Sequence, residues 1–205
     1  MTIDVPTIYT IGHSNHQIED FLGLLRSFDI ACVVDVRSAP YSKYAAQFNK
    51  EPLNNFLQQI GLQYVYMGQA LGGRWTDPEL YFPDHIIDYA KVSRTDAFRQ
   101  GMTSLLKNIR KGVCAALMCC EKDPYDCHRF VLVSRFLKEE GVVVRHILAD
   151  RTILENTELE ARLLAQYPPA QDLFAAPLNA EDVLKRAYIQ RNRDMAYRLP
   201  EDSQV

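Results

Sequence analysis

A short stretch in the second half of the chain gathers side chains that can do chemistry. From Cys119 to Arg129 the sequence reads Cys-Cys-Glu-Lys-Asp-Pro-Tyr-Asp-Cys-His-Arg. A thiol becomes a nucleophile when it ionises, and a neighbouring imidazole or guanidinium favours the thiolate. The candidate catalytic residues of this stretch are therefore Cys127, Cys119, His128 and Glu121, and Arg129 is a candidate anion-binding residue.

The segments on either side of this stretch predict a strand, a loop and a helix. Val113 to Met118 is short and wholly apolar, as a strand buried on both faces of a sheet would be. Apolar residues then recur at helical spacing from Phe130 until Gly141. We expect Asp126 to cap this helix, which places Cys127 and the two residues after it in the first turn. There the free backbone N–H groups and the helix dipole favour a thiolate or a bound phosphate.

Strand-like runs alternate with helical patterns over the first three quarters of the chain. We expect strands over residues 7–11, 31–36, 63–67, 113–118 and 142–148, and further helices over 18–28, 52–60, 84–92 and 95–110. This alternation favours an α/β fold, doubly wound, with a mostly parallel five-stranded sheet and helices on both faces.

The remainder of the chain carries no strand signal from about Arg151 onward. A helical pattern covers 152–167, prolines interrupt it, and Asn179 is expected to cap a last amphipathic helix. We interpret the basic side chains of that helix as a solvated face rather than a nucleic-acid patch: Lys185, Arg186, Arg191, Arg193 and Arg198. The sequence thus predicts an α/β domain over 1–150 and a helical C-terminal extension over 151–205 that packs on it.

Polar residues follow four successive expected strands. Ligands of open parallel sheets bind beyond the carboxyl ends of the strands, so these residues join the candidate site. His13 and Asp35 are added as catalytic residues, and Ser14, Arg37, Ser42, Gly72, Gly73 and Arg74 as substrate- or anion-binding residues. We expect seven side chains to face one crevice: His13, Asp35, Arg37, Arg74, Cys119, Glu121 and Arg129.

Each of these motifs also has a structural interpretation. Ser14, with Gln17 at capping-box spacing, can cap the helix that follows it. Asp35 and Arg37 can form a structural ion pair, and the two glycines before Arg74 can form a plain tight turn. Cys127 can be an inert buried thiol. These alternatives stay open on the sequence alone.

Taken together, the motifs resemble the family catalogued as Domain of Unknown Function 488. The matching pieces are Thr10-Ile11-Gly12-His13-Ser14, Asp35-Val36-Arg37 with Pro40 and Ser42, Phe48-Asn49, Leu71-Gly72-Gly73-Arg74, and Cys119 and Glu121 with Cys127-His128-Arg129. The similarity runs from about Thr7 to His146 and extends loosely to Asp172-Leu173-Phe174 and Ala196-Tyr197-Arg198. The family carries no assigned activity, and its pattern does not require a cysteine at Cys120.

Composition restricts the possible partners and the compartment. The chain has 205 residues, 47% of them hydrophobic, a formal net charge of −3 and a pI near 6. A polyanionic partner would therefore need a local basic patch. Five cysteines, with no signal peptide and no apolar stretch of bilayer length, favour reduced thiols in a cytoplasmic protein without membrane contact.

Three functions are compatible with these residues. The first is a cysteine-dependent transferase or hydrolase acting on a phosphorylated metabolite, a nucleotide or a nucleic-acid end, because arginines and helix N-termini would line the crevice. No cysteine has an arginine six residues later, so the Cys-x5-Arg spacing of cysteine phosphatases is absent. The second is a non-catalytic binding module for a nucleotide or another anion.

The third function is zinc binding, for which the chain offers His13, His16, Cys119, Cys127 and His128. No CxxC pair is present, and the spacing between Cys119 and Cys127 is not a common ligand spacing. We therefore assign no residue as a metal ligand, and the sequence leaves any cofactor unidentified.

The C-terminal part of the chain also carries a candidate protein-docking peptide. Gln171-Asp172-Leu173-Phe174 resembles the short peptides by which bacterial DNA-metabolism proteins dock on the sliding clamp. The alternative, which we favour, is that Leu173 and Phe174 anchor the tail on the domain.

Overall fold

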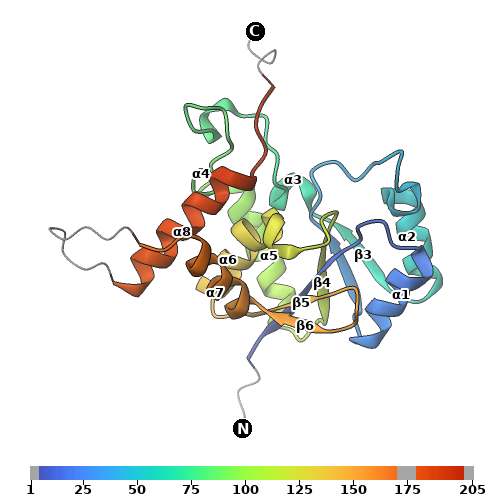
Figure 1. Cartoon of the computed structure of the whole chain (residues 1–205). Coiled ribbons are helices and arrows are strands. Elements are labelled where there is room, and N and C mark those ends of the chain that lie inside the picture. Colours follow the sequence, from blue (N-terminus) through green and yellow to red (C-terminus); the bar gives the residue numbers. More distant parts are fainter. Residues whose placement is uncertain (1–4, 170–178, 201–205) are drawn as a thin grey trace, which may run out of the picture.

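The computed structural model describes residues 5–169 and 179–200, and over these residues the chain builds one six-stranded sheet (Figure 1). The strands are β1 (Thr7–Gly12), β2 (Cys32–Asp35), β3 (Gln63–Tyr66), β4 (Ala115–Cys119), β5 (Val143–Ile147) and β6 (Ile153–Glu155). Their order is β3-β2-β4-β1-β5-β6. The first five run parallel and β6 runs antiparallel to β5. The predicted α/β class and mostly parallel sheet are confirmed.

The prediction of five strands misses β6. Its three residues lie where a helix was expected from Thr152, and Leu154 pairs with His146 of β5. An ion pair of 3.0 Å between Arg145 Nε and Glu155 Oε1 joins the same two strands. Three residues are too few for an alternating pattern, so only the pairing with β5 defines this strand. The sheet therefore continues past residue 150.

Helices cover both faces of the sheet (Figure 1). One face packs against α1 (Ile18–Ser27) and α2 (Lys50–Gln59), and the other against α5 (Asp96–Ile109), α6 (Arg135–Glu139), α7 (Asn156–Gln166) and α8 (Ala180–Met195). The buried strand β4 contributes to the hydrophobic cores on both faces. Ala116 and Met118 pack on the face covered by α1 and α2, and Leu117 and Cys119 pack on the opposite face. None of the helices in the described residues is long and apolar enough to cross a bilayer.

The chain changes its winding direction beside β4. After β1 it passes through α1 to β2, whereas after β4 it passes through α6 on the opposite face to β5. The connections that leave the carboxyl ends of β1 and β4 therefore diverge to opposite faces. This is the switch point at which α/β sheets bind ligands.

Two local predictions about helices are wrong. Ser14 does not cap α1: it has a φ of 45°, and α1 begins after Gln17 without a side-chain cap. Of the helix expected over 84–92, only α4 (Tyr89–Val92) forms, capped by Asp88. The residues before it make β-bridges instead, including Ile86 to Arg198 near the other end of the chain, a contact that no local pattern encodes.

The C-terminal helix has the expected cap, and of the five predicted basic residues Lys185, Arg186, Arg193 and Arg198 are exposed as expected. Asn179 Oδ1 accepts a hydrogen bond from the Asp182 backbone N–H at 2.8 Å. Arg191, however, is buried and donates to the Tyr125 carbonyl oxygen and to the Asp126 carboxylate. Long-range pairing thus uses part of the charge that the sequence assigned to solvent. The proposed clamp-docking peptide, 171–174, lies outside the described residues.

Candidate functional site

The carboxyl ends of β1, β2 and β4 bring three candidate residues into one neighbourhood. The His13 backbone N–H donates to the Cys119 carbonyl oxygen at 2.9 Å, which extends the pairing of β1 with β4. Arg37, two residues beyond β2, places its Nη1 3.1 Å from His13 Nε2. Because three strand ends meet here, residues from distant parts of the sequence share one buried region.

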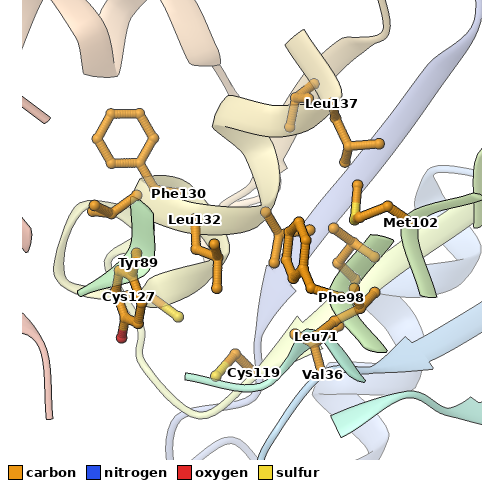
Figure 2. Packing of buried hydrophobic residues seen from close by; sticks show 14 of the residues in the cluster. Val36, Leu71, Tyr89, Phe98, Met102, Cys119, Cys127, Phe130, Leu132 and Leu137 are labelled. Carbon is orange, nitrogen blue, oxygen red and sulfur yellow. The ribbon is translucent and has the colours of Figure 1, made fainter. Parts of the chain in front are cut away.

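The densest group of reactive side chains is formed by Cys119, Cys127 and His128. His128 Nδ1 lies 3.7 Å from Cys119 Sγ and also 3.7 Å from Cys127 Sγ. The three donor atoms all lie within 4.8 Å of one another, and all three residues are buried. Both cysteines belong to the larger hydrophobic cluster, in which Tyr89 also packs (Figure 2). We refer to these three residues as the Cys/His cluster.

The imidazole of His128 is held in one orientation. Its Nε2 lies 3.1 Å from the Val36 carbonyl oxygen, so Nε2 carries the proton of that hydrogen bond and Nδ1 faces the two sulfurs. Gly73 packs against the ring, since a Cβ atom there would lie 2.9 Å from His128 Cγ and 3.0 Å from Tyr89 Oη. The glycine thus gives room for the ring rather than forming a loose turn.

The helix begins after His128, and Asp126 does not cap it. Asp126 ends a short 3₁₀ helix (Pro124–Asp126) and turns its carboxylate toward Arg191, and Cys127 is extended with φ −134° and ψ 143°. Cys127 Sγ accepts a hydrogen bond from the Arg129 backbone N–H at 3.4 Å. The predicted cap is therefore wrong, because Asp126 is engaged by a distant arginine.

The helix after Cys127 opens as a π-helix (Arg129–Ser134) before it continues as α6. Arg129 is 1% exposed, and its guanidinium donates to the backbone carbonyls of Glu121 and Lys122 at 2.8 and 3.2 Å. Its Nε has no hydrogen-bond partner among the described residues. Arg129 thus fixes the loop between β4 and the helix and brings a positive charge close to Cys127.

The protonation of the cluster is strongly perturbed. Burial raises the pKa of Cys127, but a hydrogen bond from Cys119 and the charges of Arg129 and His128 outweigh it, so the pKa lies well below its usual range. Hydrogen bonds to Cys120 and Cys127, together with burial, raise the pKa of Cys119. Burial lowers the pKa of His128, but the negative charge and hydrogen bond of Cys127 and the charge of Glu121 together outweigh burial. The pKa of His128 therefore lies above its usual value.

Glu121 connects the cluster to solvent. The residue is exposed, but its Oε2 lies 3.0 Å from Cys127 Sγ. Partial desolvation and the nearby charge of Cys127 raise the pKa of the Glu121 carboxyl. Gly12 lies directly beneath this loop, where a Cβ would come within 1.9 Å of the Glu121 carbonyl oxygen. Glycine at that position lets the loop approach β1.

Cys120 is the residue that the sequence reasoning set aside and the structure places in the site. It is exposed, unlike Cys119 and Cys127. A hydrogen bond from Cys119, partly opposed by burial, together with His13 and Arg37 lowers the pKa of Cys120 to about 4. Its position directly after a buried strand was the signal available, because the other polar candidates also lie at or after strand ends.

His13, Asp35 and Arg37 form a second group, which we call the Asp/Arg/His network. Asp35 is 0% exposed, and its carboxylate accepts from Arg37 Nε at 2.9 Å and Nη2 at 2.6 Å. Tyr64 Oη donates to the same carboxylate at 2.6 Å. His13 stacks on the Phe48 ring with centroids 4.4 Å apart. These groups are paired with one another inside the protein.

The other predicted binding residues lie farther out. Ser38 Oγ accepts from the Arg74 backbone N–H at 2.9 Å, and the exposed Arg74 side chain stacks on Tyr197. Gly72 is buried against Ser38. The Ser42 backbone N–H donates to Asn49 Oδ1 at 2.7 Å, within the loop after β2.

Ser14 and His16 also lie outside the Cys/His cluster. The Ser14 backbone N–H donates to the Cys120 carbonyl oxygen at 2.9 Å. His16, considered with His13 for zinc, is not part of the Cys/His cluster. A hollow of about 540 Å³ lies between α4, α6 and α8, and none of the candidate residues lines it.

Fold and site together define an α/β protein with a buried Cys/His cluster at the switch point of a mostly parallel sheet. The sequence model of the family described as "Domain of unknown function DUF488" matches residues 17–136, more than half of the chain, so the protein belongs to this family. The match includes the Cys/His cluster, Asp35 and Arg37, whereas His13 lies just before it. Comparisons with curated proteins and with solved structures give no significant match.

Proposed function

We propose that the Cys/His cluster binds a zinc ion and that the protein is a zinc-dependent enzyme acting on an anionic substrate. The observation that carries this proposal is the spacing of the three donor atoms. Zinc–sulfur and zinc–nitrogen bonds of about 2.3 and 2.0 Å place the sulfur and nitrogen ligand atoms of a tetrahedron about 3.5 Å apart. Both sulfur–nitrogen distances in the cluster are 3.7 Å.

The orientation of His128 supports a cation in this place. Its Nε2–H is directed to the Val36 carbonyl oxygen, which leaves the Nδ1 lone pair facing the two sulfurs. Such a backbone bond to the distal nitrogen is typical of histidines that ligate a metal. A single Nδ1 can make only one good hydrogen bond, whereas one cation can bind it and both sulfurs. Thiolate and imidazole donors select zinc over magnesium or calcium.

The side of the cluster toward Glu121 supports a catalytic rather than a purely structural metal. Catalytic zinc has three protein ligands and a fourth position for water or substrate, whereas structural zinc is closed by four. Cys119, Cys127 and His128 supply three ligands, and the exposed Glu121 adjoins Cys127. Bound zinc would polarise an oxygen of the substrate or of water, and Glu121 would act on the proton at that position.

The experiment is metal binding by the purified chain. Metal-stripped protein should bind one equivalent of Co²⁺ with thiolate-to-cobalt charge transfer and the intense visible bands of a tetrahedral site, and Zn²⁺ should displace it. Cys119→Ser, Cys127→Ser and His128→Ala should each abolish these bands. Cys32→Ser and Cys114→Ser, at thiols inside or beside the core, are the matched controls and should keep them. Weak binding without these bands, or full bands in Cys127→Ser, would refute the metal centre.

A second candidate function is thiol chemistry at Cys120, favoured by the exposure of that thiol beside His13 and Arg37. Cys127 is only 1% exposed, which makes it the poorer nucleophile for a bulky substrate. Mass spectrometry of the same preparations after limited alkylation separates the candidates. Rapid modification at Cys120 with no cobalt spectrum favours the thiol enzyme, and a cobalt spectrum that survives Cys120→Ser favours the metal enzyme.

A further inference from the structure

Three tyrosine–cation pairs involve the segments that follow the carboxyl ends of β2 and β3, outside the buried groups. Lys43 Nζ lies 5.0 Å from the centroid of the Tyr44 ring, and Lys50 Nζ lies 4.6 Å from that of Tyr66. Arg74 Cζ lies 4.8 Å from the centroid of the Tyr197 ring. We call these six side chains the tyrosine–cation rim. Their rings and charges come from four separate parts of the chain.

Three of the six rim side chains are exposed to solvent, and the other three are partly buried. Tyr44 is 88% exposed, and Lys43 and Arg74 are exposed as well. Tyr41, in the same loop, is 58% exposed. An aromatic ring exposed to this extent gains no burial from the fold, and two such rings in one loop with lysines between and after them form a surface patch. The neighbouring Glu51 carboxylate accepts a hydrogen bond from Tyr41 Oη at 2.8 Å.

Short contacts connect the rim to the candidate site. Ser38 accepts from the Arg74 backbone N–H at 2.9 Å, and its carbonyl oxygen accepts from Tyr66 Oη at 3.2 Å. The loop that carries Lys43 and Tyr44 continues to Phe48, which stacks on His13. The rim thus lies beside the buried groups, on the same edge of the sheet.

We propose that the tyrosine–cation rim binds single-stranded nucleic acid. Exposed aromatic rings stack on bases, and lysine and arginine side chains beside them bind phosphates; this combination is typical of proteins that hold single strands without reading their sequence. A duplex offers no free base faces, and an acidic peptide offers no rings to stack. Three separate pairs fit a strand of several nucleotides better than one mononucleotide.

The position of the rim also explains how a chain of net charge −3 can attract a polyanion. On the basic helix α8, Arg191 is buried and Arg193 pairs with Asp84, whereas Lys185 and Arg186 are exposed but make no tyrosine–cation pair among the described residues. Lys43 and Arg74 are exposed and carry no ion pair among the described residues. None of the rim side chains is a proposed zinc ligand, so the inference is independent of the proposed metal centre.

The test is fluorescence anisotropy with a labelled oligothymidylate of about 12 nucleotides, a length within the range that such sites cover. We expect binding to the full chain that weakens as salt rises. Tyr44→Leu should weaken binding about tenfold, as the loss of one stacked base does, while Tyr44→Phe keeps it. Lys43→Ala should lower the slope of log K against log salt by about 0.7, the value for one phosphate contact on a single strand. Lys111→Ala, an exposed lysine before β4 and so at the opposite edge, is the matched control and should change neither.

Four outcomes would overturn the inference. They are no binding at high micromolar protein, equal affinity for a duplex of the same length, unchanged binding by Tyr44→Leu, and equal effects of Lys43→Ala and Lys111→Ala. Tyr44 and Lys43 are exposed, so their variants should fold, and circular dichroism checks this. Cobalt binding by the same variants separates a failure here from a failure of the metal centre.

Discussion

The Asp/Arg/His network and the Cys/His cluster lie at the same sheet edge but differ in how completely their polar groups are paired. In the network, Asp35 accepts from Arg37 and Tyr64, and Arg37 also donates to His13 and to the Phe48 carbonyl oxygen. In the cluster, one imidazole nitrogen faces two sulfurs at equal distance. The polar groups of the Asp/Arg/His network are paired with one another, whereas the three donor atoms of the Cys/His cluster converge on one point.

This difference separates a supporting role from a chemical one. Buried polar groups are nearly always paired, so a fully paired group is accounted for by the fold alone. A group in which one nitrogen and two sulfurs converge on one point is accounted for better by a ligand that binds all three. By residue type alone, Asp35 and Arg37 are candidates for chemistry just as the cysteines are. Their hydrogen-bond partners instead indicate that they support the structure around the site.

The largest effect is expected when the network loses its cation. Arg37→Met leaves the Asp35 carboxylate buried with Tyr64 as its side-chain partner, and removing one member of a buried ion pair costs about 3–5 kcal/mol. Urea denaturation should show this loss. The double variant Asp35→Leu/Arg37→Met should recover much of it, because apolar replacement of both partners is often neutral. A folded Arg37→Met protein should still bind cobalt; loss of cobalt would contradict the separation of the two groups.

A smaller effect is expected from His146, a buried histidine that is paired like the network. Its ring contacts Thr10 and Asn156, and burial, together with the charge of Arg129, lowers its pKa to about 3. Below the ordinary pKa of about 6.5, the unfolded chain binds a proton that the folded protein does not. The free energy of unfolding should therefore fall by about 2 kcal/mol between about pH 6.5 and pH 4.5 because of this residue.

His146→Gln tests that prediction. The variant should be less stable at neutral pH but should show a shallower loss on acidification, measured by urea denaturation at several pH values. Parallel curves for the variant and the parent protein would show that His146 is not held neutral, and pairing would then be a poor guide to which buried groups are structural.

The smallest effect is expected from a change that disturbs the cluster without altering a donor. Gly73→Ala places a methyl group 2.9 Å from His128 Cγ, and overpacking of this kind costs about 1–2 kcal/mol. Cobalt affinity should fall about tenfold, because the imidazole must shift away from the sulfurs. Gly61→Ala is the comparison, since that glycine has open space around it and its penalty comes from a φ of 77°. Equal cobalt affinity in both variants would contradict a rigid, preformed cluster.

Much of the fold could be predicted from local pattern. Apolar runs and helical spacing predict five of the six strands and the long helices. This is possible because the apolar residues of a buried face recur at a fixed spacing along the sequence. The short strand β6 and the bridge between Ile86 and Arg198 were missed, since each depends on a partner distant in sequence. The cap predicted at Asp126 is wrong for the same reason: Arg191, more than sixty residues later, binds the Asp126 carboxylate.

The sequence by itself determined that polar side chains follow the strand ends, and parallel strands then place those ends at one edge of the sheet. Only the tertiary structure decided which of them are paired with one another and which stay available. That depends on strand order, which puts β4 between β1 and β2, and on side-chain distances of a few ångströms. It also depends on burial, which hides Cys127 and exposes Cys120 although both are cysteines of the same loop. Spacing along a chain cannot encode such differences, because hydrogen bonding and metal binding depend on distance and direction in space.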